Sequence, residues 1–352
     1  MRSRRSMTTI FVDPRLNLQQ SNKINNHQNG VIVEEIEGLI RVYNDGHVER
    51  SPIVSNVPCT ATLNHSNVTA RDVFIDKFTN LWARIYVPDC GADKQLMPLL
   101  VYFHGGGFCV GSAAWSCYHE FLANLASKAR CVIMSINYRL APEHRLPAAY
   151  DDGFNALMWL KHQALNHVSS EKFWLSKCNF SSLFLAGDSA GANIAYNVTM
   201  KLGSTHDIIK PYYLKGIILI QPFFGGETRM GSEKHSIQPV NSALTLSTSD
   251  TYWRLSLPLV ANRDHPWCNP RANGVAKLRE LRLPSTMVCI SEMDILKDRN
   301  LDFCSLLIGA GKRVQTVVHK GVGHAFQVLH NSQFSQLRIQ EMMSHLNAFI
   351  NQ

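Results

Sequence analysis

Short apolar runs alternate with amphipathic stretches over most of this chain. Six runs are typical of buried strands, at residues 99–103, 131–136, 183–186, 216–220, 286–290 and 314–318. Apolar residues at helical spacing mark other segments, near 116–129, 151–162, 190–202, 298–309 and 334–350. Strands that alternate with helices pair in parallel through right-handed crossovers. The pattern therefore predicts an α/β fold with a mostly parallel central sheet and helices on both of its faces.

The segments before residue 97 follow other patterns. Apolar positions at helical spacing within residues 31–43 predict a short amphipathic helix, and Asn44-Asp45-Gly46 ends it with turn chemistry. Residues 73–78 and 81–87 predict two strands that pair as an antiparallel hairpin around Thr79-Asn80. Residues 1–30 are polar, rich in Asn and Gln and without periodicity, so we expect them to be disordered or loosely ordered.

Residues 222–283 break the alternation of strands and helices. They contain Gly225-Gly226, a Ser/Thr-rich segment, several prolines and a helical run from Ser249 to Leu259. We interpret this insertion, together with residues 31–50, as a helical lid within one domain that spans 31–352. Three apolar side chains of the insertion either line a pocket or dock the lid on the core: Trp253, Leu255 and Leu259.

Composition excludes several classes of protein. The chain has 352 residues, of which 45% are hydrophobic and 18% charged, as in a globular protein with a large core. No apolar run approaches the roughly 18–20 residues of a membrane span, so we expect no membrane-spanning helix. The formal net charge is +8, but three arginines lie within residues 1–5 and the other basic residues are scattered. Because no basic run is interleaved with aromatic residues, we expect no nucleic-acid partner.

The cysteines indicate a reducing compartment. There are nine, an odd number, without a C-x-x-C pair or metal-ligand spacing, and several lie in apolar runs, as Cys131 and Cys289 do. Arginines open the chain, but the apolar stretch Ile10–Val12 is too short for the centre of a signal peptide. A cytoplasmic location is predicted. An organelle transit peptide stays open as an alternative, because no acidic residue precedes Asp13.

One five-residue motif predicts a nucleophile. Gly187-Asp188-Ser189-Ala190-Gly191 lies between the apolar run ending at Ala186 and a helical pattern. In a nucleophile elbow, a serine sits on a sharp turn from strand to helix, and small neighbours are needed because bulkier ones would clash. The hydroxyl is then exposed beside a helix N-terminus, where negative charge is favoured. Taken alone, the motif also fits an ordinary Gly-rich turn.

A second loop supports the first. His104-Gly105-Gly106-Gly107 directly follows the apolar run that ends at Phe103. Glycines after a strand let backbone N–H groups point into a cavity, which a developing oxyanion requires, and lipases and esterases pair such a loop with the elbow. A phosphate-binding loop is the competing interpretation, but neither G-x-x-x-x-G-K-[ST] nor G-x-G-x-x-G beside an acidic ribose ligand is present. Acyl transfer is therefore the leading hypothesis.

The catalytic partners of Ser189 should follow it along the chain, first an acid and then a histidine. His324 lies in a Gly-rich loop directly after the strand at 314–318, whereas His319, on the last residues of that strand, is the alternative. Asp294 lies in the loop after the strand at 286–290. Asp298 is better explained as a helix-start residue favoured by the helix dipole. The predicted triad is Ser189, His324 and Asp294.

The segment from Tyr138 to Asp152 is too unusual for a generic loop. From its residues alone we infer that a strand ends, and that a helix begins near Asp151 or Asp152, either of which can serve as its N-cap. Glu143 and His144 invite a metal-site interpretation, but no further ligand cluster supports one. We therefore expect no metal and no cofactor.

Taken together, the motifs identify a family. The chain from about Ile32 resembles the plant carboxylesterases of the hormone-sensitive-lipase-like α/β-hydrolase family. The motifs that carry the resemblance are HGGGF, YRLAPEH-x-x-PAAYDD, GDSAGAN, the S-x-x-D segment at Ser291–Asp294 and the G-x-x-H loop. It implies an α/β-hydrolase fold with a helical lid. It also implies that the backbone amides of Gly106, Gly107 and Ala190 form the oxyanion hole, and that Asp188 and Glu143 support the site.

Some members of the family are not esterases. Gibberellin receptors resemble this chain but have lost the catalytic histidine and the third loop glycine, whereas His324 and Gly107 are present here. Isoflavanone dehydratases are also similar but carry threonine at the position of Ser189. We expect a serine carboxylesterase that hydrolyses small carboxylic esters through an acyl-enzyme. A non-hydrolytic, hormone-like receptor and a lyase or dehydratase are the alternatives; the physiological ester and any protein partner stay open.

Overall fold

A computed structural model describes most of the chain. The described residues are 30–61, 63, 67–89, 91, 95–203, 208–235, 242–330 and 332–352. The prediction for residues 1–30 therefore lies, apart from Gly30, outside the described residues. Within them, no helix combines the length and the apolarity that crossing a bilayer requires.

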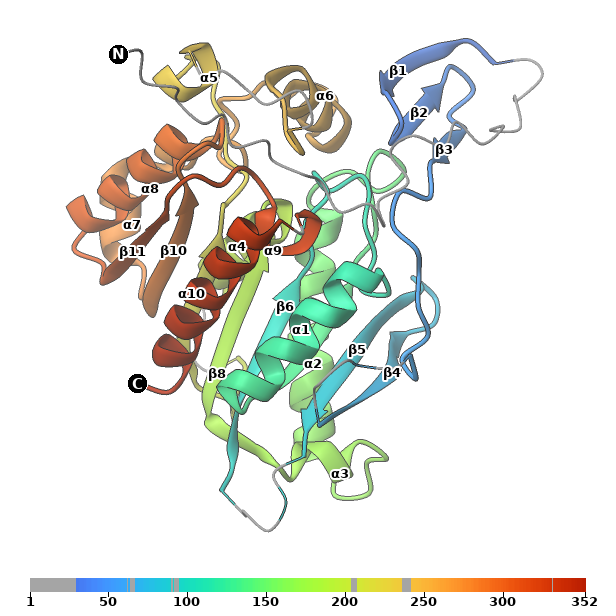
Figure 1. Cartoon of the computed structure of the whole chain (residues 1–352), viewed down its shortest axis with the longest axis vertical. Helices are drawn as coiled ribbons and strands as arrows, with labels where there is room; N and C mark the ends of the chain where they lie inside the picture. Colours follow the sequence, from blue (N-terminus) through green and yellow to red (C-terminus); the bar gives the residue numbers. More distant parts are fainter. Residues whose placement is uncertain are drawn as a thin grey trace, which may run out of the picture.

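Eight strands form the central sheet (Figure 1). In chain order they are β4 (Val68–Asp76), β5 (Leu81–Pro88), β6 (Met97–Phe103), β7 (Val132–Asn137), β8 (Cys178–Asp188), β9 (Leu214–Ile220), β10 (Ser285–Ser291) and β11 (Val314–His319). Their order across the sheet is β11-β10-β9-β8-β6-β7-β5-β4. β5 runs antiparallel to both of its neighbours, and all other neighbours are parallel. The predicted mostly parallel sheet is confirmed, as is the hairpin of β4 and β5.

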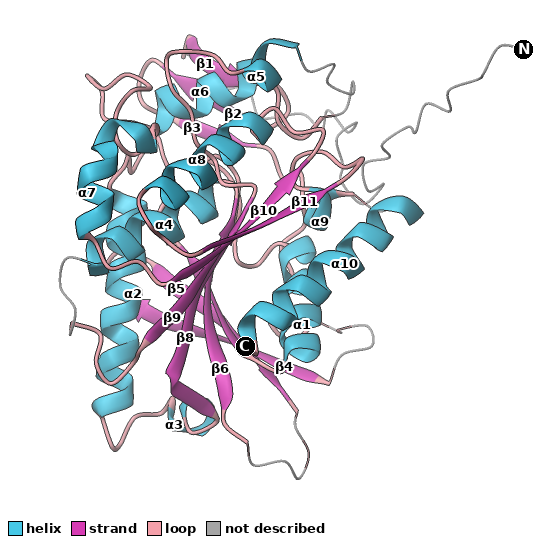
Figure 2. Cartoon of the chain, turned by 90° about the vertical axis from the view of Figure 1, so that its left-hand side faces the viewer, coloured by secondary structure: helices cyan, strands magenta, loops and turns pink. Residues whose placement is uncertain are grey.

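Helices cover both faces of this sheet (Figure 2). On one face lie α1 (Ser116–Ala129), α9 (Phe326–Leu329) and α10 (Gln333–Ile350), which contact one another. On the other lie α2 (Ala148–Leu165), α4 (Ala190–Gly203), α7 (Gly274–Glu280) and α8 (Lys297–Gly309). A short helix, α3 (Lys172–Leu175), precedes β8. The predicted helices at 116–129, 190–202, 298–309 and 334–350 are confirmed to within a residue or two at each end.

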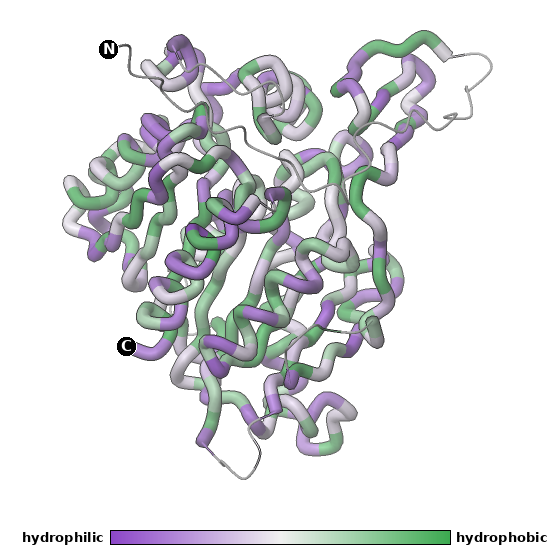
Figure 3. Tube along the Cα trace, in the orientation of Figure 1, coloured by the Kyte–Doolittle hydropathy of each residue, from purple (hydrophilic) through white to green (hydrophobic). Residues whose placement is uncertain are grey.

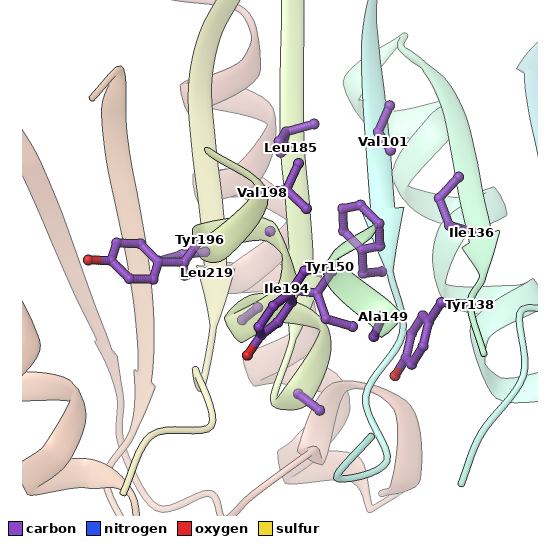
Figure 4. Packing of buried hydrophobic residues seen from close by; sticks show 14 of the residues in the cluster. Val101, Ile136, Tyr138, Ala149, Tyr150, Leu185, Ile194, Tyr196, Val198 and Leu219 are labelled. Atoms are coloured by element: carbon purple, nitrogen blue, oxygen red, sulfur yellow. The ribbon is translucent and has the colours of Figure 1, made fainter. Parts of the chain in front are cut away.

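Successive side chains of the central strands point to opposite faces of the sheet and pack in two separate hydrophobic cores. Val101 of β6 and Leu185 of β8 pack with Val198 of α4 in one core, which Figure 4 shows from close by. Leu100 and Tyr102 of β6 point to the opposite face and pack in the other core, under α1 and α10. Both faces of the central strands are thus apolar, and Figure 3 shows the hydrophobic residues in green along them. Burial on both sides explains why these strands are apolar runs without alternation.

The predicted helix at 31–43 is wrong. β1 (Ile32–Ile36) and β2 (Ile40–Tyr43) form a hairpin there, and β3 (Val48–Arg50) completes a three-stranded antiparallel sheet. The run is rich in β-branched residues, and Gly38 has a φ of 72°, which places a turn in the middle of the expected helix. Apolar residues four apart are also an even number apart, so Ile36 and Ile40 face the same side of a hairpin as well. The predicted turn at Asn44-Asp45-Gly46 is present between β2 and β3.

The start of α2 also differs from the prediction. The helix begins at Ala148, with Pro147 at its N-cap, so neither Asp151 nor Asp152 caps it. The Asp152 carboxylate instead accepts hydrogen bonds from the backbone and the guanidinium of Arg139. Asp152 is buried, and the charge-assisted hydrogen bonds from the Arg139 guanidinium compensate its carboxylate for the loss of water.

Segment 222–283 contains α5 (Gly231–His235), α6 (Leu246–Ser256), the 3-10 helix η1 (Pro270–Asn273) and α7. Of these, α5 and α6 lie at the carboxyl edge of the sheet (Figure 1), and α6 contacts β1 of the three-stranded sheet, whereas α7 lies beside α8 on one face of the central sheet. Thr245 caps α6 by accepting a hydrogen bond from the Thr248 amide. We call α6 and the sheet β1–β3 the cap. Its function as a lid remains a prediction.

Candidate active site

Ser189 occupies a sharp turn between β8 and α4. Its backbone φ is 53°, a left-handed conformation that residues other than glycine adopt only at a cost in conformational free energy. Glycines surround it because nothing larger fits: a Cβ on Gly191 would lie 1.9 Å from the carbonyl oxygen of Phe103, the last residue of β6. The register of the sheet explains the crowding, since Phe103 pairs with Gly187 across β6 and β8. The predicted strand–turn–helix geometry is confirmed.

The structure brings the three residues of the predicted triad together. The Ser189 Oγ lies 2.9 Å from His324 Nε2, and His324 Nδ1 lies 2.6 Å from Asp294 Oδ2. All three are buried, with 5%, 5% and 2% of their surfaces exposed in the order Ser189, His324, Asp294. A carboxylate can only accept from Nδ1–H, which leaves the lone pair on Nε2 to accept the serine proton. Such a line of groups activates a serine hydroxyl as a nucleophile.

The two alternatives for the triad lie elsewhere. His319 ends β11, is 2% exposed, and packs against Phe326 and His345 rather than near Ser189. Asp298 lies in the first turn of α8, as expected for a helix-start residue, and accepts a hydrogen bond from the Ser232 amide.

Gln221 holds the His324 loop in place, and no sequence motif points to it. Its side-chain oxygen accepts from the Ala325 amide at 2.6 Å, and its side-chain amide donates to Ser291 Oγ at 2.6 Å. It thereby links the residue after His324 to the end of β10, three residues before Asp294. Its position at the carboxyl end of β9, the same edge as the other site residues, is the one signal in the sequence that could have found it.

The glycine loop has the form that an oxyanion site needs. Gly106 and Gly107 have φ values of 109° and 57°. A Cβ on Gly106 would lie 2.1 Å from the Val110 carbonyl oxygen, and one on Gly107 would lie 2.3 Å from the ring of Tyr252 in α6. The amides of both glycines donate to no acceptor among the described residues, and the amide of Ala190, the first residue of α4, has no acceptor within its helix. Three donors are therefore available beside Ser189.

Asp188 connects the glycine loop to the elbow. Its carboxylate accepts from the hydroxyl of Tyr102 at 2.8 Å and from that of Tyr118 at 3.0 Å. The Tyr118 hydroxyl in turn accepts from the Gly105 amide at 2.8 Å. Burial raises the pKa of Asp188 to about 6, although the two tyrosine hydrogen bonds act in the opposite direction. The side chain is thus a buried anchor under the loop.

His104 and Tyr138 fix the other side of the glycine loop. The Nδ1–H of His104 donates to the Gly105 carbonyl at 2.8 Å, and its ring stacks on Tyr138 with 4.3 Å between the ring centroids. The Tyr138 hydroxyl donates to the His104 carbonyl at 2.8 Å. Burial lowers the pKa of His104 to about 4, so its ring is neutral at neutral pH. The residue shapes the loop without adding a charge.

Glu143 ties the cap to the site. Its two carboxylate oxygens accept from the Arg50 guanidinium of β3 at 2.7 and 2.6 Å. Arg50 also donates to the carbonyl oxygens of Cys109 and Ala141. Burial, the largest single effect, acts to raise the pKa of Glu143, but the hydrogen bonds from Arg50, a backbone hydrogen bond and the positive charge of Arg50 together outweigh it, and the pKa is lowered. Glu143 is an ion-pair partner of Arg50, and among the described residues no group of three His, Cys, Asp or Glu side chains is arranged to hold a metal ion.

A cavity of about 320 Å³ opens above Ser189. This volume lies at the lower end of the usual range for small-molecule sites. Trp253, Leu255 and Leu259, which were expected either to line a pocket or to dock the lid on the core, do not line this cavity. Trp253 stacks on Phe223 and is fully buried, and Leu259 is 85% exposed. The cap and the segment before it line the cavity through other residues, among them Ile36, Glu37, Leu39, Leu244, Thr248 and Tyr252.

Comparisons with known proteins identify the fold and the relatives of this chain. Residues 100–328, more than half of the chain, match the family model described as the alpha/beta hydrolase fold. The chain is 47% identical over 332 residues to "Probable carboxylesterase 6" of Arabidopsis thaliana, a match that covers 94% of this chain and 95% of that protein. It is 36% identical over 293 residues to "Carboxylesterase 20" of the same plant, covering 80% of this chain and 86% of the relative.

Solved structures share the architecture. A hyperthermophilic esterase from the archaeon Pyrobaculum calidifontis superposes with a TM-score of 0.65, covering 83% of this chain and 84% of that one. The two sequences are 24% identical, so this likeness concerns the fold alone.

Proposed function

The chain belongs to the α/β-hydrolase family and, within it, to the plant carboxylesterases related to hormone-sensitive lipase; it is a carboxylic ester hydrolase, and we propose that it works through a Ser189-His324-Asp294 triad and an acyl-enzyme. One observation carries this proposal. Serine, imidazole and carboxylate form a continuous hydrogen-bonded line, with distances of 2.9 and 2.6 Å, and Ser189 and His324 line the cavity.

In the acylation step, His324 acts as the general base. Its Nε2 takes the proton of the Ser189 hydroxyl as Oγ attacks the ester carbonyl carbon, and Asp294 stabilises the resulting imidazolium through Nδ1–H. Base catalysis of this kind contributes about 10²–10⁴-fold to the rate. His324 then gives the proton to the oxygen of the departing alcohol, which breaks the C–O bond and leaves Ser189 acylated.

The negative charge that develops on the carbonyl oxygen needs fixed donors. We assign them to the amides of Gly106, Gly107 and Ala190, the last at the N-terminus of α4, where the helix dipole adds to the attraction. Each such donor is worth about 10²–10³-fold in kcat. Asp188 has no contact with the reacting atoms in this scheme and instead holds the glycine loop in position through Tyr118.

Deacylation repeats the chemistry with water. His324 takes a proton from a water molecule, whose oxygen attacks the acyl carbon, and the tetrahedral intermediate collapses as His324 returns the proton to Ser189 Oγ. The carboxylic acid leaves and the enzyme is restored. No bond in this cycle requires an oxidant, a metal or a cofactor.

The experiment compares hydrolysis of 4-nitrophenyl acetate by the native protein, Ser189→Ala and Ser305→Ala. Ser305 is an exposed serine of α8 and controls for loss of a hydroxyl as such. We expect kcat for Ser189→Ala to fall at least about 10³-fold, given the size of triad effects, and the control to match the native protein. Equal rates for native protein and Ser189→Ala reject the proposed triad, and equal rates at the level of the uncatalysed reaction favour a receptor or a lyase on the same fold.

We further propose that the substrate is a small ester, that the cap acts as a lid, and that the enzyme works in the cytoplasm without a nucleic-acid partner. The eight cysteines of the described residues carry free thiols, which supports a reducing compartment. Fractionation of plant cells that express a tagged full-length chain tests the location, and recovery of the tag in an organelle lumen contradicts it.

A further inference from the structure

The charged side chains that line the cavity above Ser189 all have the same sign. Among its described lining residues, the side chains that carry charge at neutral pH are the carboxylates of Glu37 and Asp188, and no lysine or arginine is present. The chain as a whole carries a formal net charge of +8, so the cavity differs in sign from the molecule around it. An uncompensated field of one sign in a concave site selects ligands by charge.

Glu37 is the carboxylate that a bound ester can reach from the solvent side. It lies in the turn between β1 and β2 and is exposed, while Ile36 and Leu39 on either side of it also line the cavity. The neighbouring glutamates are neutralised: Glu34 pairs with Arg254 at 2.8 Å and Glu35 with Arg41 at 2.6 Å. Glu37 has no cationic partner among the described residues, so its charge at the cavity rim is unopposed.

Two arginines near the cavity are already paired with other carboxylates, and a histidine that lines the cavity is neutral. Arg50, which reaches the glycine loop, is engaged by Glu143 at 2.6 Å, and Arg254 of the cap is engaged by Glu34. His330 lines the cavity and is 5% exposed, and neither of its ring nitrogens has a hydrogen-bond partner among the described residues. Burial, with a smaller contribution from His324, lowers the pKa of His330 to about 4, so the ring is neutral at neutral pH.

Deeper in the cavity, Asp188 adds to the negative field. Its pKa of about 6 leaves it mostly ionised above pH 7, beneath the position where His324 becomes an imidazolium during catalysis. A substrate that brings its own carboxylate or phosphate would add a third negative charge beside Glu37 and Asp188. A substrate that brings an ammonium group would find the rim carboxylate unoccupied.

We propose that this site selects neutral and cationic esters over anionic ones, and that Glu37 is the residue that sets this preference. The substrate class is an ester whose acyl or alcohol part ends in a protonated or quaternary amine, with the amine near Glu37 and the ester carbonyl at Ser189. This inference rests on the proposed catalytic role of Ser189.

The expected effect is modest because Glu37 is exposed. An exposed ion pair changes affinity by about twofold to fivefold. Attraction of a cation and repulsion of an anion act in opposite directions, so the ratio of the two kcat/KM values should change on the order of tenfold when the charge is removed. Salt should reduce the preference, because the Debye length falls from about 10 Å at 0.1 M to about 3 Å at 1 M.

The test uses three 4-nitrophenyl esters with acyl chains of equal length that end in tert-butyl, trimethylammonium or carboxylate. The first two ends have the same shape, so the comparison isolates charge. We expect the native enzyme to have a higher kcat/KM for the cationic ester than for the anionic one, after both are divided by the value for the neutral ester. Glu37→Gln should lower this cationic-to-anionic ratio about tenfold, and Glu37→Lys should lower it further.

Glu35→Gln is the matched control. Glu35 lies two residues before Glu37 and carries the same charge, but its side chain does not line the cavity. The inference is supported if the ratio falls in Glu37→Gln, stays within about twofold of native in Glu35→Gln, and declines with salt in the native enzyme. It is overturned if Glu37→Gln leaves the ratio unchanged, or if both variants lower it equally.

The two proposals fail in distinguishable ways. If Ser189→Ala still hydrolyses the neutral ester at the native rate, the proposed triad fails. If Ser189→Ala is inactive while Glu37→Gln keeps the native ratio, only the charge preference fails.

Discussion

Replacing Gly107 with alanine probes how closely the cap is fitted to the glycine loop. A Cβ at this position would lie 2.3 Å from Cγ of Tyr252, where ordinary contacts are 3.4–4 Å, so the loop or α6 must move by about 1 Å. Gly107 also has a φ of 57°, and alanine in a left-handed conformation costs about 1–2 kcal/mol.

The two effects predict different readouts. Displacement of about 1 Å in a catalytic group costs about 10²-fold in rate, and loss of one oxyanion donor costs about 10²–10³-fold. We therefore expect Gly107→Ala to lower kcat/KM for 4-nitrophenyl acetate by about 10²–10³-fold. Its free energy of unfolding, measured in urea, should fall by only about 1–3 kcal/mol.

Two further variants separate strain from displacement. Gly311 has a φ of 73°, and a Cβ added there would meet nothing within 4 Å, so Gly311→Ala should cost stability through backbone strain and leave kcat/KM unchanged. Adding Tyr252→Ala to Gly107→Ala removes the clash and should recover part of the lost activity. A kcat/KM for Gly107→Ala within about threefold of native would refute the reasoning, since the loop would then tolerate what the geometry forbids.

Three other predictions concern Asp294 of the proposed triad and two groups that support the site. Asp294→Asn should lower kcat by about 10⁴-fold with little change in KM, because the wrong imidazole tautomer is favoured; steady-state kinetics measure this, and a loss below about tenfold contradicts it. Asp188 has a pKa of about 6 in the folded chain against an ordinary value of 3.8. The folded state therefore binds more protons between these values, and stability is lost as pH rises from about 4 to 6, by about 3 kcal/mol. Urea unfolding of native protein relative to Asp188→Asn should show that loss, and a flat or rising difference opposes it. Arg50→Ala leaves Glu143 unpaired and should lower kcat/KM for 4-nitrophenyl acetate about tenfold, because the cap loses its anchor to the glycine loop. An unchanged kcat/KM would show that the Arg50–Glu143 ion pair has no part in catalysis.

The sequence predicts best where local pattern and tertiary burial agree. Strands β6, β8 and β10 carry long apolar runs that are buried on both faces, so these runs are visible without knowledge of their neighbours. The elbow and the glycine loop are visible because tight turns restrict residue type, as the space around Gly191 shows. His324 and Asp294 follow from chain order and from the rule that parallel strands end at one edge of the sheet.

The failures have a common physical cause. The pattern at 31–43 is compatible with both helix and hairpin, and the choice depends on packing against α6, which is more than 200 residues away in sequence. Contacts between distant segments also decide the role of Tyr252 over Gly107 and of Gln221 beside Ala325. Local propensity carries no information on such pairs, so the lining of the cavity is not predictable from the sequence alone.

The central claim is that Ser189 carries the acyl group, and rapid acid quenching tests it most directly. Native enzyme mixed with excess 4-nitrophenyl acetate and quenched during turnover is digested and examined by mass spectrometry. The account predicts an acetylated peptide that contains Ser189, absent from Ser189→Ala. Ester consumption at the native rate, with acetyl found on another residue and none on Ser189, would contradict it.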